Sequence, residues 1–113
     1  MNSPVAPRVN RRINFRRKAK SCVKACCRRG SLDLGPNIGV GLLDLSETGV
    51  RLVLREQVLL HHEVSVTLEG PHSRQPLKRI GRVMWCLETA EKNFVAGVQF
   101  DKRLPYGEWT RMT

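Results

Sequence analysis

The stretch Val40–Leu54, VGLLDLSETGVRLVL, contains two short apolar runs separated by the polar sequence Ser46–Gly49. In Val50–Leu54 apolar side chains alternate with Arg51, as in a strand that buries one face. Two such runs joined by a short polar segment that contains glycine are typical of a β-hairpin. We therefore predict strands at Val40–Leu45 and Val50–Leu54 with a tight turn between them.

Four further segments are rich in β-branched, apolar or small residues and end at polar or glycine-containing turns. These segments are Cys22–Cys27, Val64–Leu68, Ile80–Leu87 and Phe94–Phe100. No long amphipathic helix pattern separates them, so an antiparallel barrel or sandwich is expected. Only Pro105–Met112 has room for a helical turn or two, with Trp109 as its buried anchor. The sequence thus predicts an all-β domain with six strands and a short C-terminal helical segment.

The positive charge of the chain is concentrated at its N-terminus. The 113 residues include 20 Lys and Arg against 10 Asp and Glu, a net charge of +10, and no acidic residue precedes Asp33. Residues 1–18 have few apolar side chains, so we expect a flexible basic arm without a core of its own, followed by a β-barrel over residues 19–113. Concentrated positive charge of this kind usually faces a partner that carries phosphate groups.

Several classes of protein are disfavoured by the sequence. It has no apolar run of the roughly 18 to 20 residues that a membrane-spanning helix needs, and its first residues do not resemble a secretory signal, so we expect a cytoplasmic protein. No recognisable catalytic motif occurs, which predicts a protein that is not an enzyme. The four cysteines form neither a CxxC pair nor a zinc-ligand spacing. We therefore expect no metal and no cofactor, and interpret Cys22, Cys26, Cys27 and Cys86 as small core or barrel-wall residues.

Two short patterns remain that could bind a ligand. Arginines spaced four apart occur as Arg8 with Arg12, Arg12 with Arg16, and Arg51 with Arg55, but a chain with this many arginines produces such pairs by chance. We interpret the last pair as barrel surface. The pattern DxSxxG over Asp44–Gly49 is much rarer by chance, and it falls on the predicted hairpin turn.

Taken together, these motifs resemble those of the PilZ domain family. The sequence RRINFR at residues 11–16 stands just before the first predicted strand, DLSETG joins the second and third, and GVQF at residues 97–100 ends the last. The resemblance extends from about Arg11 to Arg103. It implies a six-stranded antiparallel β-barrel of the split-barrel type that binds the bacterial second messenger cyclic di-GMP.

The resemblance also implies which residues bind the ligand, namely Arg11, Arg12, Arg16, Asp44, Ser46 and Gly49. Guanidinium groups suit a cyclic dinucleotide because they donate hydrogen bonds to phosphate oxygens, donate two hydrogen bonds to the O6 and N7 edge of guanine, and stack on bases. In the turn, Ser46 offers a hydroxyl and Asp44 an acceptor for guanine N–H groups or for the arginines. Gly49 permits a positive φ and close backbone approach.

Three functions stay open at this point. The favoured one is a non-enzymatic cyclic di-GMP receptor that acts in trans on an unknown protein partner. A small β-barrel that binds single-stranded nucleic acid would also suit the basic arm, but aromatic residues make up only 5% of the chain, so nucleic acid is the less favoured partner. The third is a PilZ-like interaction module without ligand, in which the turn residues only shape the hairpin. The sequence does not indicate an oligomeric state.

Overall fold

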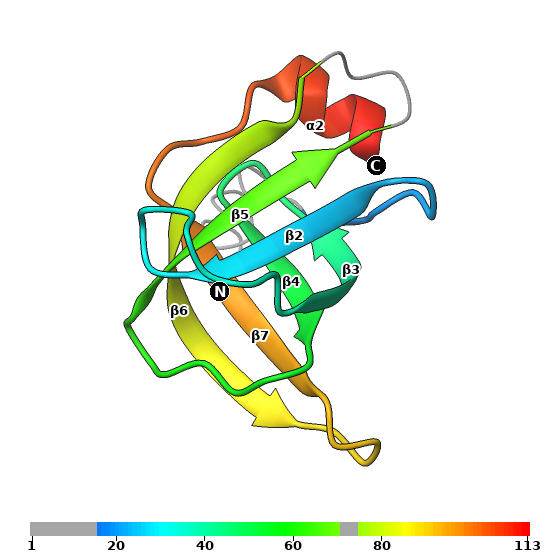
Figure 1. Cartoon of the computed structure of the whole chain (residues 1–113). Coiled ribbons are helices and arrows are strands. Elements are labelled where there is room, and N and C mark those ends of the chain that lie inside the picture. The colour runs from blue at the N-terminus through cyan, green and yellow to red at the C-terminus, as the bar shows by residue number, and fades with distance from the viewer. Residues whose placement is uncertain (1–15, 71–74) are drawn as a thin grey trace, which may run out of the picture.

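The computed structural model describes residues 16–70 and 75–113. Its strands form one curled antiparallel sheet in the order β1-β3-β4-β7-β6-β5-β2, which closes part of the way into a barrel (Figure 1). The elements are β1 (Arg17–Lys18), β2 (Lys24–Arg29), β3 (Gly39–Leu45), β4 (Gly49–Leu54), β5 (Glu63–Glu69), β6 (Leu77–Glu88), β7 (Phe94–Phe100) and α2 (Tyr106–Met112). The predicted all-β, barrel-like fold with a short C-terminal helix is confirmed.

All six predicted strands are present, although several of their bounds differ and one further strand was not predicted. β6 begins at Leu77 rather than Ile80, and the two-residue strand β1 pairs with the end of β3. β2 begins at Lys24 rather than Cys22, because the amide of Val23 donates to the carbonyl of Lys20 at 3.0 Å and closes a turn there. The start of this strand was therefore predicted two residues too early.

The four cysteines differ in burial. Cys27 is fully buried in the core as predicted, and burial raises the pKa of its thiol to about 12. Cys26 and Cys86 are half-buried, which fits barrel-wall positions. Cys22 is exposed, so its prediction as a core or wall residue was wrong, because it lies in the turn before β2.

The core lies inside the curl of the sheet and is made by alternate residues of the strands. Val50, Leu52 and Leu54 of β4 and Val66 of β5 are fully buried, as the period of two along a half-buried strand requires. The helix α2 packs against this core with Trp109, which is 4% exposed. Its indole Nε1 donates to the carbonyl of Leu45 at 2.8 Å, so the predicted anchor is confirmed.

The helix is also tied to the segment that leads into β2, since the amide of Lys20 donates to the carbonyl of Met112 at 2.9 Å. These contacts hold α2 beside the end of β3, next to the β3–β4 turn. No helix in residues 16–70 or 75–113 is long and apolar enough to span a membrane.

One close contact between neighbouring strands gives a test of the packing. Trp85 on β6 stands opposite Gly97 on β7, and a Cβ at Gly97 would lie 2.3 Å from the indole Nε1. The substitution Gly97→Ala should displace the indole and lower the free energy of unfolding by about 1–3 kcal/mol. Urea denaturation measures this loss.

A matched control is Gly107→Ala in α2, where the nearest heavy atom to the new methyl group is Arg111 Nη2 at 3.9 Å. This change should leave stability equal or slightly higher, because alanine favours a helix over glycine by roughly 0.5–1 kcal/mol. Equal stability of the Gly97→Ala variant and the wild type would contradict the packing described for Trp85.

Candidate functional site

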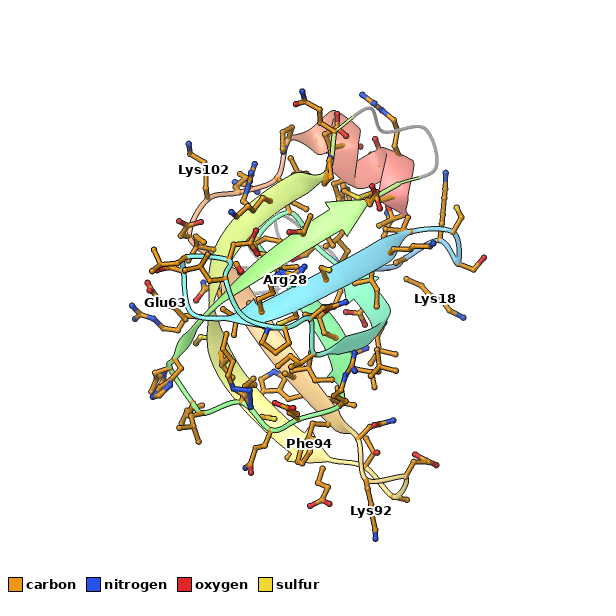
Figure 2. The ribbon with its side chains drawn as sticks, in the orientation of Figure 1. Lys18, Arg28, Glu63, Lys92, Phe94 and Lys102 are labelled. Atoms are coloured by element: carbon orange, nitrogen blue, oxygen red, sulfur yellow. The ribbon has the colours of Figure 1, made fainter. Side chains whose placement is uncertain are left out.

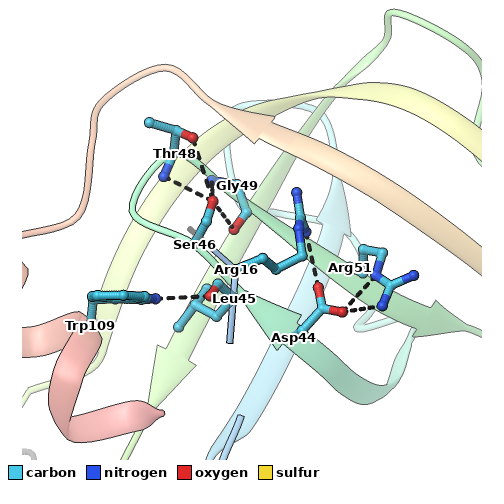
Figure 3. Close-up of polar contacts among 8 residues, drawn as sticks. All are labelled: Arg16, Asp44, Leu45, Ser46, Thr48, Gly49, Arg51 and Trp109. Carbon is cyan, nitrogen blue, oxygen red and sulfur yellow. Dashed lines mark hydrogen bonds and ion pairs between the residues drawn. The ribbon is translucent and has the colours of Figure 1, made fainter. Parts of the chain in front are cut away.

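The turn between β3 and β4 is held from within by Ser46. Its hydroxyl oxygen accepts from the amide of Gly49 at 3.0 Å and from the amide of Thr48 at 3.2 Å, and its own amide donates to the carbonyl of Gly49 at 2.9 Å (Figure 3). Ser46 is only 1% exposed. Its hydroxyl therefore serves the backbone of its own turn, as serine hydroxyls often do.

Gly49 allows close backbone approach at the start of β4, which is one of the two roles predicted for it. The other, a positive φ, is not used, since among the described residues the only glycine with a positive φ is Gly30. A Cβ at Gly49 would lie 2.6 Å from the carbonyl oxygen of Val98 on β7. Only glycine lets the two backbones approach this closely.

Asp44, near the end of β3, is the centre of a small charge cluster. One carboxylate oxygen accepts from Arg16 Nη1 at 3.0 Å, and the other accepts from Arg51 Nε at 2.7 Å and also from Arg51 Nη2 (Figure 3). The Asp44 side chain is 10% exposed, whereas those of Arg16 and Arg51 are 41% and 44% exposed. The carboxylate thus joins two guanidiniums that keep part of their surface open to solvent.

Strand pairing explains how these three side chains meet. β1 runs antiparallel to β3 with Lys18 opposite Asp44, which brings Arg16, one residue before β1, to the hairpin. Arg51 on β4 is the direct cross-strand partner of Asp44. Oppositely charged residues at such positions stabilise a sheet by roughly 0.2–1 kcal/mol.

The arginines keep Asp44 ionised despite its burial. Burial by itself raises the pKa of this carboxyl, but the hydrogen bonds and positive charges of Arg51 and Arg16 outweigh it, so its pKa lies below the ordinary value. Two guanidiniums and one carboxylate leave the cluster with a net positive charge. Its exposed side can therefore accept an anionic group such as a phosphate.

Two of the predicted site residues, Arg11 and Arg12, lie outside the described residues. Of the others, the structure brings Arg16 and Asp44 into direct contact and places Ser46 and Gly49 in the adjoining turn. Sequence reasoning missed Arg51, which is on the barrel surface as predicted but also belongs to this cluster. Its charge could have indicated this role, because Arg51 is opposite in charge to Asp44 and pairs with it directly across the hairpin.

The site is in contact with the C-terminal segment as well. The amide of Leu104 donates to the carbonyl of Glu47 at 2.7 Å, and Arg103 Nη2 lies 3.4 Å from the Glu47 carboxylate. The guanidinium of Arg17 stacks over the Trp109 ring, 4.6 Å from its centroid. The residues that flank Arg16 and Asp44 are thus packed against α2 and the segment before it.

This combination of a curled antiparallel sheet, an arginine before its first strand and a DxSxxG turn defines the class of the protein. Residues 10–109 match the PilZ domain, and the chain belongs to this family. PilZ domains are generally non-catalytic receptors for cyclic di-GMP. No curated protein matches the chain.

Removing the Ser46 hydroxyl should weaken the fold itself. The substitution Ser46→Ala leaves the amides of Thr48 and Gly49 without their acceptor in a buried turn, and such a loss costs about 1–3 kcal/mol. Thermal or urea unfolding measures the change, with Ser21→Ala on the exposed surface as control. An unchanged stability of Ser46→Ala would show that the turn does not depend on these bonds.

The Asp44 cluster should make stability sensitive to acid. Because the folded-state pKa of Asp44 is lowered, its contribution is present above its unfolded pKa of about 3.9 and is lost as the pH falls through the folded value. We expect Asp44→Asn to be less stable than wild type near neutral pH, and the difference to shrink below about pH 4. Unfolding curves across this pH range measure it. A constant difference would contradict the ion pairs.

Proposed function

We propose that this protein is a non-enzymatic receptor that binds cyclic di-GMP between the arginines of residues 11–16 and the Asp44–Gly49 turn, and that it acts in trans on a protein partner. The contact between Arg16 Nη1 and Asp44 at 3.0 Å is the main support. It joins the two sequence patterns whose combination resembles a PilZ ligand site, although they are 28 residues apart in the chain.

In this proposal Asp44 positions the arginines rather than reading the guanine directly. Its two oxygens already accept from Arg16 and Arg51, which holds both guanidiniums on the same face of the hairpin. A guanidinium has five N–H donors, so each can still donate to a phosphate or to the O6 and N7 edge of a guanine. Arg12 would close over the other side of the ligand, and Arg11 would stack on it or pair with a phosphate.

Binding of single-stranded nucleic acid is less well supported. Nucleic-acid-binding barrels usually stack bases on aromatic side chains displayed by their strands. Among the large apolar residues exposed in the described part of the chain, the only aromatic one is Tyr106, which belongs to α2 rather than to the sheet. This arrangement favours a small ligand that is gripped by arginines.

Calorimetric titration with cyclic di-GMP tests the proposal. We expect Arg16→Ala to weaken binding by about tenfold or more, because a lost hydrogen bond to a charged group costs roughly 1.5–3 kcal/mol. Arg51→Ala should weaken binding as well. Arg55→Ala, at the exposed position just after β4, is the matched control and should bind as wild type does.

Two outcomes would count against this function. Binding that survives the double substitution Arg12→Ala and Arg16→Ala would remove the N-terminal arginines from the site. Tighter binding of an oligonucleotide than of cyclic di-GMP, measured in parallel at two salt concentrations, would favour the nucleic-acid alternative.

A further inference from the structure

A groove of about 870 Å³ lies between the loop that joins β2 to β3 (residues 30–38) and the loop that joins β4 to β5 (residues 55–62). Figure 1 shows both loops on the same side of the barrel. Because β3 begins and β4 ends beside these loops, the groove lies at the other end of this hairpin from the Ser46–Gly49 turn, roughly 15–20 Å along the strands. The apolar side chains that line it include Leu32, Leu34, Val58 and Leu59.

Four leucines of these two loops are unusually exposed for large apolar side chains. Leu32 and Leu34 of the β2–β3 loop are 74% and 82% exposed, and Leu59 and Leu60 of the β4–β5 loop are 58% and 55% exposed. Three of them line the same groove and the fourth is the chain neighbour of Leu59. Single exposed leucines are common on protein surfaces, but a group of them around one groove marks an interaction surface.

Asp33 fixes the β2–β3 loop so that the leucines on either side of it face solvent. Asp33 has a φ of 60°, and its carboxylate accepts from Ser65 Oγ on β5 at 3.0 Å and pairs with Lys78 Nζ on β6 at 3.1 Å. Its side chain thus points onto the sheet, whereas Leu32 and Leu34 remain exposed. The exposure of these leucines therefore belongs to a loop with a defined conformation.

The two loops are also tied to each other. Arg29 at the end of β2 pairs with Glu56 at 3.0 Å, and the amide of Arg55 donates to the carbonyl of Ile38 at 2.9 Å. These contacts hold both walls of the groove in place. A preformed surface of this kind loses little conformational freedom when it binds a partner.

The charge around the groove balances, unlike that of the chain as a whole. Residues 28–38 and 55–63 contain three basic residues, Arg28, Arg29 and Arg55, and three acidic ones, Asp33, Glu56 and Glu63. The whole chain has a net charge of +10, so two copies repel each other except where the local charge cancels. An anionic bilayer or a nucleic acid would instead favour a face with excess positive charge.

The shape of the surface suits contact with a second copy of the chain. Leu34, at 82% the most exposed of the large apolar side chains described, projects beside a hollow that Val58 and Leu59 line. A twofold interface uses the same patch on both copies, so a projection on one copy has to meet a hollow on the other. This patch contains both, as well as charges of both signs.

We propose that the groove is the contact surface of a symmetric dimer, in which Leu32 and Leu34 of one copy enter the groove of the other. The charged residues around the groove then face opposite charges on the second copy. This inference goes beyond the proposed function, because it uses a surface apart from the proposed ligand site. In Figure 2, Glu63 at the groove and Lys18, two residues after Arg16, lie on opposite sides of the view.

Sedimentation equilibrium of the full chain from micromolar to millimolar concentration tests the proposal. We expect a monomer–dimer equilibrium that tightens as salt is raised, because salt screens the repulsion between two chains of charge +10. The double variant Leu32→Ser and Leu34→Ser should raise the dissociation constant by about tenfold or more, because apolar side chains buried at the centre of an interface carry much of its affinity.

The matched control is Leu87→Ser on β6. Leu87 is 65% exposed but does not line the groove, so this variant makes the same chemical change and should dimerise as wild type does. Dilution of the labelled wild-type chain in NMR makes the test without any substitution. The amides of residues 31–34 and 57–60 should shift with concentration, and those of residues 86–88 should not.

Three results would overturn the proposal. One is a chain that stays monomeric at millimolar concentration. Another is a dimer that forms equally well in the Leu32→Ser and Leu34→Ser variant and leaves the amides of both loops unshifted. The third is a monomeric chain that sediments with phosphatidylglycerol vesicles only when both leucines are present, which would assign the surface to a membrane.

Discussion

The carboxylate of Asp44, shared by Arg16 and Arg51, is the interaction on which the site depends. β1 has only two residues, too few to hold an edge strand by its ladder alone, and the Arg16 ion pair attaches the chain just before it to the hairpin. A carboxylate this buried would be costly without its partners, because without both arginines it would be an uncompensated buried charge. The same contact therefore stabilises the end of the sheet and places two guanidiniums on one face.

Most of the fold could be predicted because the relevant signals are local. The alternation of Val50, Leu52 and Leu54 around Arg51 reports a strand with one buried face, and the polar break before it reports the turn. β1 could not be predicted, because Arg17–Lys18 contains no apolar residue and is a strand only through its pairing with β3. The late start of β2 could not be predicted either, because the turn at Lys20–Val23 is closed by a backbone hydrogen bond, which does not depend on the side chains present.

The candidate site was predictable in part. The DxSxxG pattern identified the turn, but the sequence did not distinguish a hydroxyl that faces a ligand from one that holds its own backbone, as Ser46 does. Nor did it show why Gly49 is a glycine, because the cause is the carbonyl of Val98, on a strand nearly fifty residues away. Arg51 was overlooked because its role depends on hairpin register, which becomes clear only once the turn length is known.

The self-contained hydrogen bonding of the Ser46–Gly49 turn has a consequence for how related sequences are interpreted. A chain that lost every arginine of residues 11–16 would still need Ser46 and Gly49 to build the hairpin and to let β7 pass close to it. Folding alone would then preserve most of the turn motif during evolutionary drift. The turn by itself is therefore weak evidence that a homologue senses a nucleotide, and the arginines ahead of the first strand carry the greater diagnostic weight.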